Sequence, residues 1–264
     1  MDIANLANGA RLDSCERQGQ TGAADRLIVA LDFPSAEAAM GLVDKLEGVC
    51  RWFKVGMELY YAAGNPILDR LRERGFDVFL DLKLHDIPNT VAGAVRTVAS
   101  AGASLLTIHA GGGEWMMRAA AQAADRPNAP RLLAVTVLTS MDAEELRAVG
   151  VGDGSCADDM VGTQVLRLAR LAQAAGIHGL VCSPLEVAAV REAMGPDTLL
   201  VVPGIRPAAV AGSAATADDQ SRVATAADAI SRGASMLVVG RPITQAPDPA
   251  KAAAGILAEI KGAI

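Results

Sequence analysis

Two lysines lie inside short apolar segments, where a charged side chain is unusual. An isolated ammonium in such a segment costs several kcal/mol unless an opposite charge pairs with it. Asp81 precedes Lys83 by two residues, so an extended strand would point both side chains to the same face. Asp32 and Asp86 come just after the ends of two apolar segments, and Lys54 lies inside a third. One Asp–Lys pair alone also fits a purely structural role. Several such groups at neighbouring strand ends favour an active site that stabilises developing charge and transfers a proton.

A second set of residues has the chemistry to bind a phosphate. Gly240 and Arg241 follow the apolar segment 236–239, where a backbone without a side chain and a forked guanidinium can meet phosphate oxygens. Arg206 follows the preceding apolar segment in the same way. A Gly-Arg pair by itself also fits a surface arginine, and it is the position at a strand end that favours phosphate binding. Gln220 ends the polar, glycine-containing loop 206–220, for which we predict a lid.

Other polar residues at strand ends are weaker candidates. The hydroxyls of Thr139 and Ser140 follow an apolar segment and can bond the polar edge of a ligand, although these residue types are also common in turns. The glycines at 111–113 follow His109 without a dinucleotide-binding or Walker pattern, which favours a tight turn. The three histidines lack metal-ligand spacing, so the sequence predicts no metal site.

The elements that must position these residues follow a regular order. Short apolar segments alternate with amphipathic stretches of helical period, and glycines precede many of the apolar segments. Eight such units predict an α/β fold, a single (β/α)8 barrel with eight parallel strands, in which ligands bind at the carboxyl ends. A doubly wound sheet is the alternative. The expected strands are 27–31, 52–55, 78–82, 105–108, 132–138, 179–182, 199–202 and 236–239.

The sequence also predicts where helices begin and how the chain is divided into segments. Ser35, Asn65, Ser183 and Asp248 each stand where a capping residue would begin a helix. We expect a polar N-terminal extension over residues 1–25 and one barrel domain over 26–264.

Composition excludes several classes of protein. Of the 264 residues, 51% are hydrophobic and 20% are charged, which is incompatible with a disordered chain. A net charge of −6 with 3% aromatic residues argues against nucleic-acid binding. No uncharged apolar stretch is long enough for a membrane span. Four cysteines without a framework spacing, and no secretory signal, predict a cytoplasmic protein.

The segment from Asp81 to Thr90 resembles the signature of the orotidine 5′-phosphate decarboxylase family. It reads Asp-Leu-Lys-Leu-His-Asp-Ile-Pro-Asn-Thr. Further segments resemble the same family in the same order: Leu-Asp at 31–32, Phe-Lys-Val-Gly at 53–56, Val-Leu-Thr-Ser at 137–140, Pro-Gly-Ile-Arg at 203–206, Asp-Gln at 219–220 and Val-Gly-Arg-Pro-Ile at 239–243. The first 25 residues and the length of the 206–220 loop depart from the family pattern.

The resemblance implies a reaction, the loss of CO2 from orotidine 5′-monophosphate to give UMP, the last step of UMP biosynthesis, without a cofactor. Lys83 would protonate the ring carbanion, and Asp81 would lie beside the substrate carboxylate. Lys54 would link the carboxylates and the ribose, and Asp32 would bind a ribose hydroxyl.

The resemblance also implies a homodimer, because in this family Asp86 and Thr90 would reach the active site of the neighbouring subunit. The remaining implied contacts are Thr139 and Ser140 with the pyrimidine edge, and Gln220, Gly240 and Arg241 with the phosphate.

Three other functions remain open at this point. A magnesium-dependent sugar-phosphate lyase of the same superfamily shares the Asp-x-Lys-x-x-Asp pattern but not the Ile-Pro-Asn-Thr that follows it here. A Schiff-base aldolase needs an isolated, uncharged lysine, whereas carboxylates on both sides of Lys83 favour its ammonium form. A catalytically silent phosphate-ligand binder would not need Asp81 and Lys83 to be intact.

Overall fold

Eight parallel strands close into a barrel, in the computed structural model that describes residues 22–152, 159–207 and 222–264. Each strand pairs with its neighbours in sequence, and β8 pairs with β1 to close the sheet. The strands are β1 Leu27–Ala30, β2 Trp52–Gly56, β3 Asp77–Leu84, β4 Leu105–His109, β5 Arg131–Val135, β6 Gly179–Val181, β7 Leu199–Val202 and β8 Met236–Val239. All eight predicted strands are present, and the predicted (β/α)8 barrel is confirmed.

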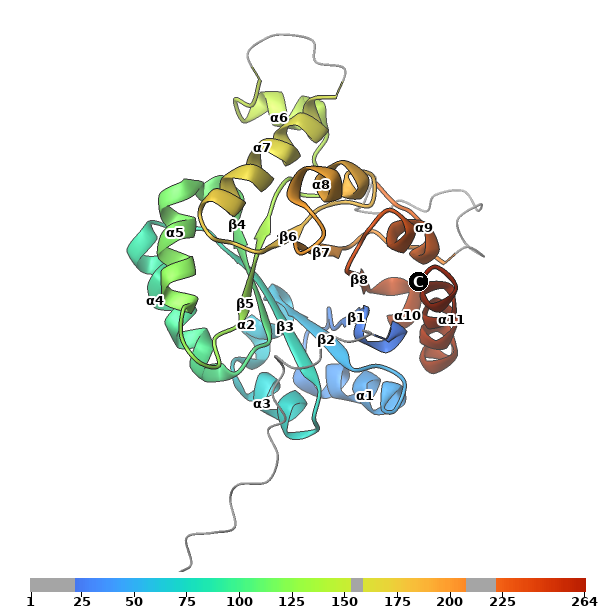
Figure 1. Ribbon diagram of the computed structural model, residues 1–264. Coiled ribbons are helices and arrows are strands. Elements are labelled where there is room, and N and C mark those ends of the chain that lie inside the picture. Colours follow the sequence, from blue (N-terminus) through green and yellow to red (C-terminus); the bar gives the residue numbers. More distant parts are fainter. Residues whose placement is uncertain (1–21, 153–158, 208–221) are drawn as a thin grey trace, which may run out of the picture.

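Helices form a ring outside the strands, as Figure 1 shows in a view along the barrel. They are α1 Ala36–Leu46, α2 Met57–Ala63, α3 Pro66–Glu73, α4 Pro88–Ala101, α5 Gly113–Ala124, α6 Ala143–Ala148, α7 Met160–Ala174, α8 Val187–Met194, α9 Ala226–Ser231, α10 Arg241–Thr244 and α11 Pro249–Gly262, with 3₁₀ turns η1 Ala23–Asp25 and η2 Ala110–Gly112. None of the helices in these described stretches is long and apolar enough to cross a membrane.

The alternation of side chains along each strand produces two separate cores. Inward-pointing residues such as Ile28, Phe79 and Leu105 fill the barrel interior. Their sequence neighbours, such as Leu80 and Leu106, pack outward against the helices. This is the layered packing expected of an eight-stranded barrel whose strands are covered on both faces.

Helix caps agree with the sequence at some positions and not at others. Ser35 and Asp248 accept hydrogen bonds from backbone N–H groups of α1 and α11, as predicted. Asn65 begins α3, but its side chain accepts a hydrogen bond from Tyr60 and does not cap. The prediction that a helix begins at Ser183 is wrong. The Ser183 N–H donates to Glu186, and this turn delays α8 until Val187.

Two strands differ in length from the prediction. The strand β5 ends at Val135 and not at 138, since its ladders with β4 and β6 both end there and only the N–H of Thr136 continues, with a hydrogen bond to the carbonyl of Val181. The strand β3 continues two residues beyond the predicted end at 82, through Lys83 to Leu84. The extra residues belong to an irregularity that shapes the site.

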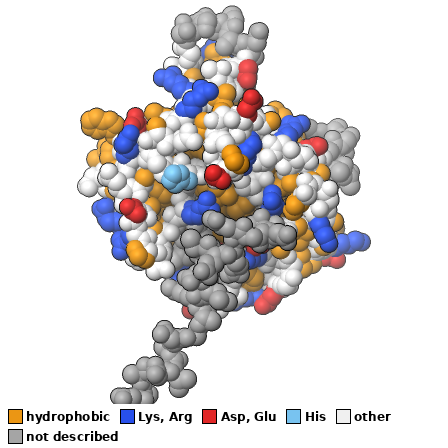
Figure 2. Space-filling view, in the orientation of Figure 1, with side chains coloured by type: hydrophobic (Ala, Val, Ile, Leu, Met, Phe, Trp, Pro, Cys, Tyr) orange, Lys and Arg blue, Asp and Glu red, His pale blue; other side chains and the backbone are white. Residues whose placement is uncertain are grey.

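The surface and the start of the barrel add two observations. On the face seen in Figure 2, basic and acidic side chains are interspersed and form no continuous basic patch.

Asp25, at the end of the expected extension, accepts a 3.0 Å hydrogen bond from Arg51, which also pairs with Asp77. Residues 1–21 of that extension lie outside the described residues.

Candidate active site

A cavity of about 480 Å³ opens at the carboxyl ends of the strands. Lining residues come from seven of the strands or the turns that follow them, as expected for this fold. The described lining residues are Ala30, Asp32, Lys54, Phe79, Asp81, Lys83, Val135, Val137, Leu138, Thr139, Val181, Cys182, Pro203, Gly204, Arg206, Val238, Gly240, Arg241 and Gln245. The apolar barrel core therefore forms the floor, and the charged residues form one wall.

Lys54 joins two carboxylates across neighbouring strands. Its Nζ lies 3.0 Å from Oδ1 of Asp32 and 3.6 Å from Oδ2 of Asp81. The strand register accounts for this arrangement, because Ala30 pairs with Lys54 and Gly56 pairs with Asp81. Lys83 extends the chain of charges, with its Nζ 2.9 Å from Oδ1 of Asp81. The result is the alternating order of carboxylate, ammonium, carboxylate and ammonium that the sequence predicts.

An irregularity in β3 places Lys83. Leu80 pairs with Leu106 and Leu84 pairs with Ile108, so four steps along β3 match two steps along β4. Within this bulge Lys83 has φ +49°, a left-handed conformation that is rare for a residue with a side chain. Bulges of this kind redirect side chains and are frequent next to active sites.

Asp81 is nearly buried, and its surroundings favour the ionised form. Burial raises the pKa of the Asp81 carboxyl. The positive charges of Lys54 and Lys83, with hydrogen bonds from Lys83 and Thr107, outweigh burial and leave the pKa below its usual value. The carboxylate is therefore a fixed negative charge at the centre of the wall.

Three of the predicted phosphate-binding residues, Gly240, Arg241 and Arg206, lie in the same cavity. Gly240 is the residue before α10, and Arg241 is the first residue of that helix. Arg206 also lines the cavity, where burial lowers the pKa of its guanidinium, and its Nη1 donates to the carbonyl of Ile205. Two guanidiniums and a glycine backbone thus face one ligand space from the ends of β7 and β8.

Not every predicted residue lines this cavity. Thr139 and Ser140 both belong to a turn after the end of β5. Thr139 lines the cavity, whereas Ser140 is exposed and does not line it. Asp86 and Thr90 are exposed and lie outside the lining, and Asp86 accepts a hydrogen bond from the N–H of Ile87. Gln220 and most of the predicted lid, residues 208–221, lie outside the described residues.

The structure adds residues that the sequence reasoning missed. Thr107 is fully buried on β4 and contacts both Asp81 and Lys83. Its signal in the sequence is a polar residue at an inward position of an otherwise apolar strand. Glu186 and Arg222 form a nearly buried ion pair at the rim, with Oε1 and Nη1 2.5 Å apart. No spacing could have revealed this pair, because the residues are far apart in sequence.

Two histidines stack beside the charged wall. The rings of His85 and His109 have centroids 5.2 Å apart and are nearly parallel. Burial lowers the pKa of His109, and the neighbouring His85 and Lys83 lower it further. Among the residues described, no three histidine, cysteine or acidic side chains are grouped so that they could hold a metal ion.

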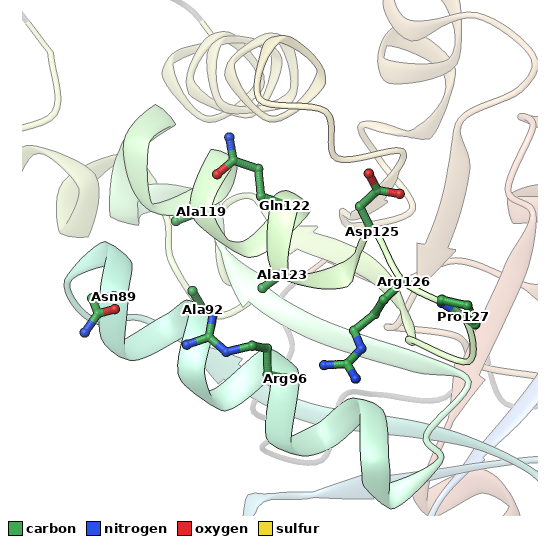
Figure 3. Close-up of a pocket in the computed structure, with 9 residues that line it drawn as sticks. All are labelled: Asn89, Ala92, Arg96, Ala119, Gln122, Ala123, Asp125, Arg126 and Pro127. Carbon is green, nitrogen blue, oxygen red and sulfur yellow. The ribbon is translucent and has the colours of Figure 1, made fainter.

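A second groove, of about 740 Å³, lies on the outside of the barrel, between α4 and α5. Small residues such as Ala92 and Ala123 line its floor, and the side chains of Arg96 and Arg126 extend from its two sides in Figure 3. None of its lining residues also lines the barrel cavity. The clustered charges that could do chemistry therefore belong to the barrel cavity.

Comparison with known proteins gives consistent matches over most of the chain. Residues 25–256 match the model of the orotidine 5′-phosphate decarboxylase / HUMPS family. Similar proteins named orotidine 5′-phosphate decarboxylase include one from Maridesulfovibrio salexigens, 49% identical over 89% of this chain and 98% of the relative. Another, from Opitutus terrae, is 51% identical over 89% of this chain and 98% of the relative.

Solved structures agree with these matches. The crystal structure of orotidine 5′-phosphate decarboxylase from Lactobacillus acidophilus has a TM-score of 0.76 and 39% identity, covering 89% of this chain and 99% of that one. An uncharacterized conserved protein from Geobacillus kaustophilus has a TM-score of 0.73 and 37% identity, with the same coverage. The similarity therefore extends over the whole barrel and not over a single motif.

Proposed function

The chain belongs to the orotidine 5′-phosphate decarboxylase / HUMPS family, and we propose that it converts orotidine 5′-monophosphate to UMP and CO2 in pyrimidine biosynthesis. The names of relatives about 50% identical over about 90% of the chain support this activity. The observation that carries the proposal is the charged wall, in which Lys83 and Lys54 alternate with Asp81 and Asp32 at the mouth of the barrel.

Substrate binding follows from the two ends of the cavity. Arg241, Arg206 and the backbone at Gly240 would hold the phosphate, and Thr139 would contact the pyrimidine edge. Lys54 and Asp32 would bind the ribose. The substrate carboxylate would then lie beside Asp81, where two negative charges in a partly buried space disfavour the bound ground state.

The chemical step needs one proton, and Lys83 would supply it. The bond between the ring carbon and the carboxylate breaks, CO2 leaves, and the electron pair stays on the ring carbon. The Lys83 ammonium stabilises this developing charge and transfers a proton to the carbon, which gives UMP. Solvent then returns a proton to the lysine amine. The proposal requires no cofactor.

Binding of the substrate phosphate can contribute to lowering the barrier of the reaction. A carbanion on the ring is poorly delocalised, so the barrier must fall by about 20 kcal/mol, near the upper end of what enzymes achieve. The phosphate lies away from the reacting carbon. Its contacts with Arg206 and Arg241 can hold the substrate against the repulsion from Asp81.

We further propose a homodimer with shared sites. Asp86 and Thr90 are exposed beside the mouth and do not line the cavity of their own chain. Exposed apolar side chains accompany them after β2, β3 and β4, namely Met57, Tyr61, Ile87 and Trp115. Exposed large apolar side chains after three neighbouring strands support an interface on this side of the barrel. A cytoplasmic location remains part of the proposal, in keeping with the free, buried thiols of Cys50 and Cys182.

The test follows the ultraviolet absorbance of orotidine 5′-monophosphate after addition of purified protein, with and without EDTA. We expect rapid loss of the orotate chromophore, UMP as the product, and the same rate with chelator. Turnover of sugar phosphates that EDTA abolishes would instead support the magnesium-dependent lyase. Borohydride trapping of Lys83 with a carbonyl substrate would support an aldolase, and ligand binding without turnover would support a binding protein.

A further inference from the structure

We propose that Thr107 is a positioning residue, whose hydroxyl couples the Lys83 backbone to the Asp81 carboxylate and so sets the geometry of the charged wall. This inference rests on the proposed decarboxylation. Thr107 lies at an inward position of β4, two residues after Leu105 of the barrel interior, and is fully buried. A buried hydroxyl on an apolar strand must be hydrogen-bonded, and both of its partners are at the site.

The direction of each hydrogen bond follows from chemistry. Oγ1 of Thr107 lies 2.8 Å from the backbone nitrogen of Lys83 and 3.0 Å from Oδ1 of Asp81. A backbone N–H can only donate, so the hydroxyl accepts from Lys83. The single hydroxyl proton then goes to the carboxylate, which can only accept when ionised. Thr107 therefore connects the two residues in one fixed order.

The bulge explains why this connection is needed. Where β3 departs from regular pairing with β4, Lys83 adopts its left-handed conformation. The Thr107 hydroxyl gives its N–H a hydrogen-bond acceptor on the neighbouring strand. Without it, a partly buried N–H would lose its partner at the position where the backbone is already strained.

The second hydrogen bond orients the carboxylate. Oδ1 of Asp81 receives both the Lys83 ammonium, at 2.9 Å, and the Thr107 hydroxyl. The other oxygen, Oδ2, then faces Lys54 at 3.6 Å. Two donors on Oδ1 fix the orientation of the carboxylate plane. Oδ1 therefore stays paired with Lys83, and Oδ2 stays directed at Lys54. Loss of the hydroxyl frees this rotation and misplaces the proton donor.

The chain offers a matched control in Thr136. Thr136 is also a buried threonine at the mouth of the barrel, 1% exposed, and its hydroxyl donates to the carbonyl of Val181 at 2.9 Å. It does not line the cavity. Replacing either threonine with valine keeps the shape and removes one buried hydroxyl, so the two variants differ in the partners that the hydroxyl loses.

The experiment compares Thr107→Val, Thr107→Ser and Thr136→Val with the wild-type protein. We expect Thr107→Val to lower kcat on orotidine 5′-monophosphate by about 10²-fold with little change in KM, the effect of a misplaced catalytic group. Thr107→Ser, which keeps the hydroxyl, restores most of the activity. Thr136→Val leaves kcat near the wild-type value. Equal kcat in Thr107→Val and Thr136→Val, or no rescue by serine, would overturn the inference.

A readout without turnover separates this inference from the proposed function. We expect carbon-detected NMR titration of the Asp81 carboxyl to show a higher pKa in Thr107→Val than in the wild-type protein, because a hydrogen bond to the ionised form is lost. An unchanged pKa would overturn the positioning role even in an active enzyme. Inactivity of the wild-type protein would overturn only the proposed reaction. If Thr107→Val does not fold, the pair Thr107→Ser and Thr107→Ala makes the same comparison.

Discussion

The Nζ of Lys83 lies 2.9 Å from Oδ1 of Asp81, although the two residues are separated by a single residue on one strand. In a regular strand, side chains two residues apart project in parallel from Cα atoms roughly 6.6 Å apart. The bulge in β3 and the left-handed backbone of Lys83 let the two side chains converge. Such backbone strain costs of order 1–3 kcal/mol and persists only where the surroundings fix it. Here it lies at the two residues proposed for the chemistry.

Removing the proposed proton donor gives the most direct prediction. Lys83→Ala should lower kcat/KM by at least about 10⁴-fold, because it removes both the proton and the charge that stabilises the carbanion. The fold should persist, as judged by circular dichroism and urea unfolding. Lys45→Ala, at an exposed position on α1, is the control and should keep full activity. Unchanged turnover in Lys83→Ala would refute the assigned donor.

The pH dependence of stability reports on Asp81. The pKa of Asp81 is lowered from 3.8 in the folded protein. The folded state therefore favours the ionised carboxylate more strongly than the unfolded chain does. This stabilisation is complete above the unfolded value of about 4 and is lost as the pH falls through the lower folded value. We expect Asp81→Asn to reduce the free energy of unfolding by about 3 kcal/mol near neutral pH.

Urea unfolding of both proteins between pH 3 and pH 7 checks this expectation. The difference between the wild-type protein and Asp81→Asn should be constant from pH 5 upward and should shrink below about pH 4. Asp44→Asn removes an exposed carboxylate paired with Arg74 and should change stability by at most about 1 kcal/mol. A difference that grows toward acid pH would contradict the low pKa of Asp81.

The sequence predicts the scaffold of this site better than its fine geometry. Short apolar segments between amphipathic stretches predict the eight strands, and the two-residue period of a strand predicts the inward positions of Asp81 and Lys83. The sequence does not predict the bulge at Lys83 or the hydroxyl of Thr107, since both depend on how β3 pairs with β4. Ser140 illustrates the same limit. It is exposed in a turn that begins after the strand pairing of β5 has ended, and the sequence does not show where that pairing ends.

Gly56 provides a steric probe of Lys54. A Cβ at this position would lie 2.9 Å from Nζ of Lys54 and 3.1 Å from Oδ1 of Asp32. The backbone there has φ −88°, which alanine adopts without strain. Gly56→Ala should therefore change stability by less than about 1 kcal/mol, because only the ends of flexible side chains must move.

Activity should respond more strongly than stability in Gly56→Ala. Displacing the Lys54 amine should lower kcat/KM by about 10- to 100-fold, measured by the loss of orotate absorbance. Gly41→Ala on α1 is the control, since an added Cβ there meets nothing within 4 Å. Full activity in Gly56→Ala would mean that the position of the Lys54 amine does not limit the reaction.

The rim ion pair predicts a coupled effect on stability. Glu186 accepts from Arg222 and from the N–H of Ser183, while Arg222 also donates to the carbonyl of Leu138. The pair thus ties together the turns that follow β5 and β6 with the segment that precedes α9. Glu186→Gln should reduce the free energy of unfolding by about 3 kcal/mol, because it leaves a nearly buried guanidinium without its counter-charge.

A double-mutant cycle measures that coupling. Glu186→Gln combined with Arg222→Met should cost clearly less than the sum of the two single changes, since the double variant buries no unpaired charge. Urea unfolding at neutral pH gives all four values. Additive effects would show that the two side chains contribute independently.

Subunit mixing tests whether Asp86 completes the site of a neighbouring chain. If the protein forms the proposed homodimer, Lys83→Ala and Asp86→Ala should each be nearly inactive when expressed alone. When both chains are co-expressed with different tags, a mixed dimer holds one site with an intact Lys83 and an intact Asp86 from the other chain. Random pairing in a two-fold dimer then restores roughly a quarter of the wild-type activity.

In the matched control, the Lys83→Ala chain is co-expressed with the Lys54→Ala chain. Both lysines line the cavity of the same chain, so every mixed dimer has one defect in each site and no activity returns. Recovery in the first mixture and not in the second requires that Asp86 act across the interface. Equal, negligible activity in both would mean that Asp86 serves its own chain, and the exposed position next to Ile87 would then need another explanation.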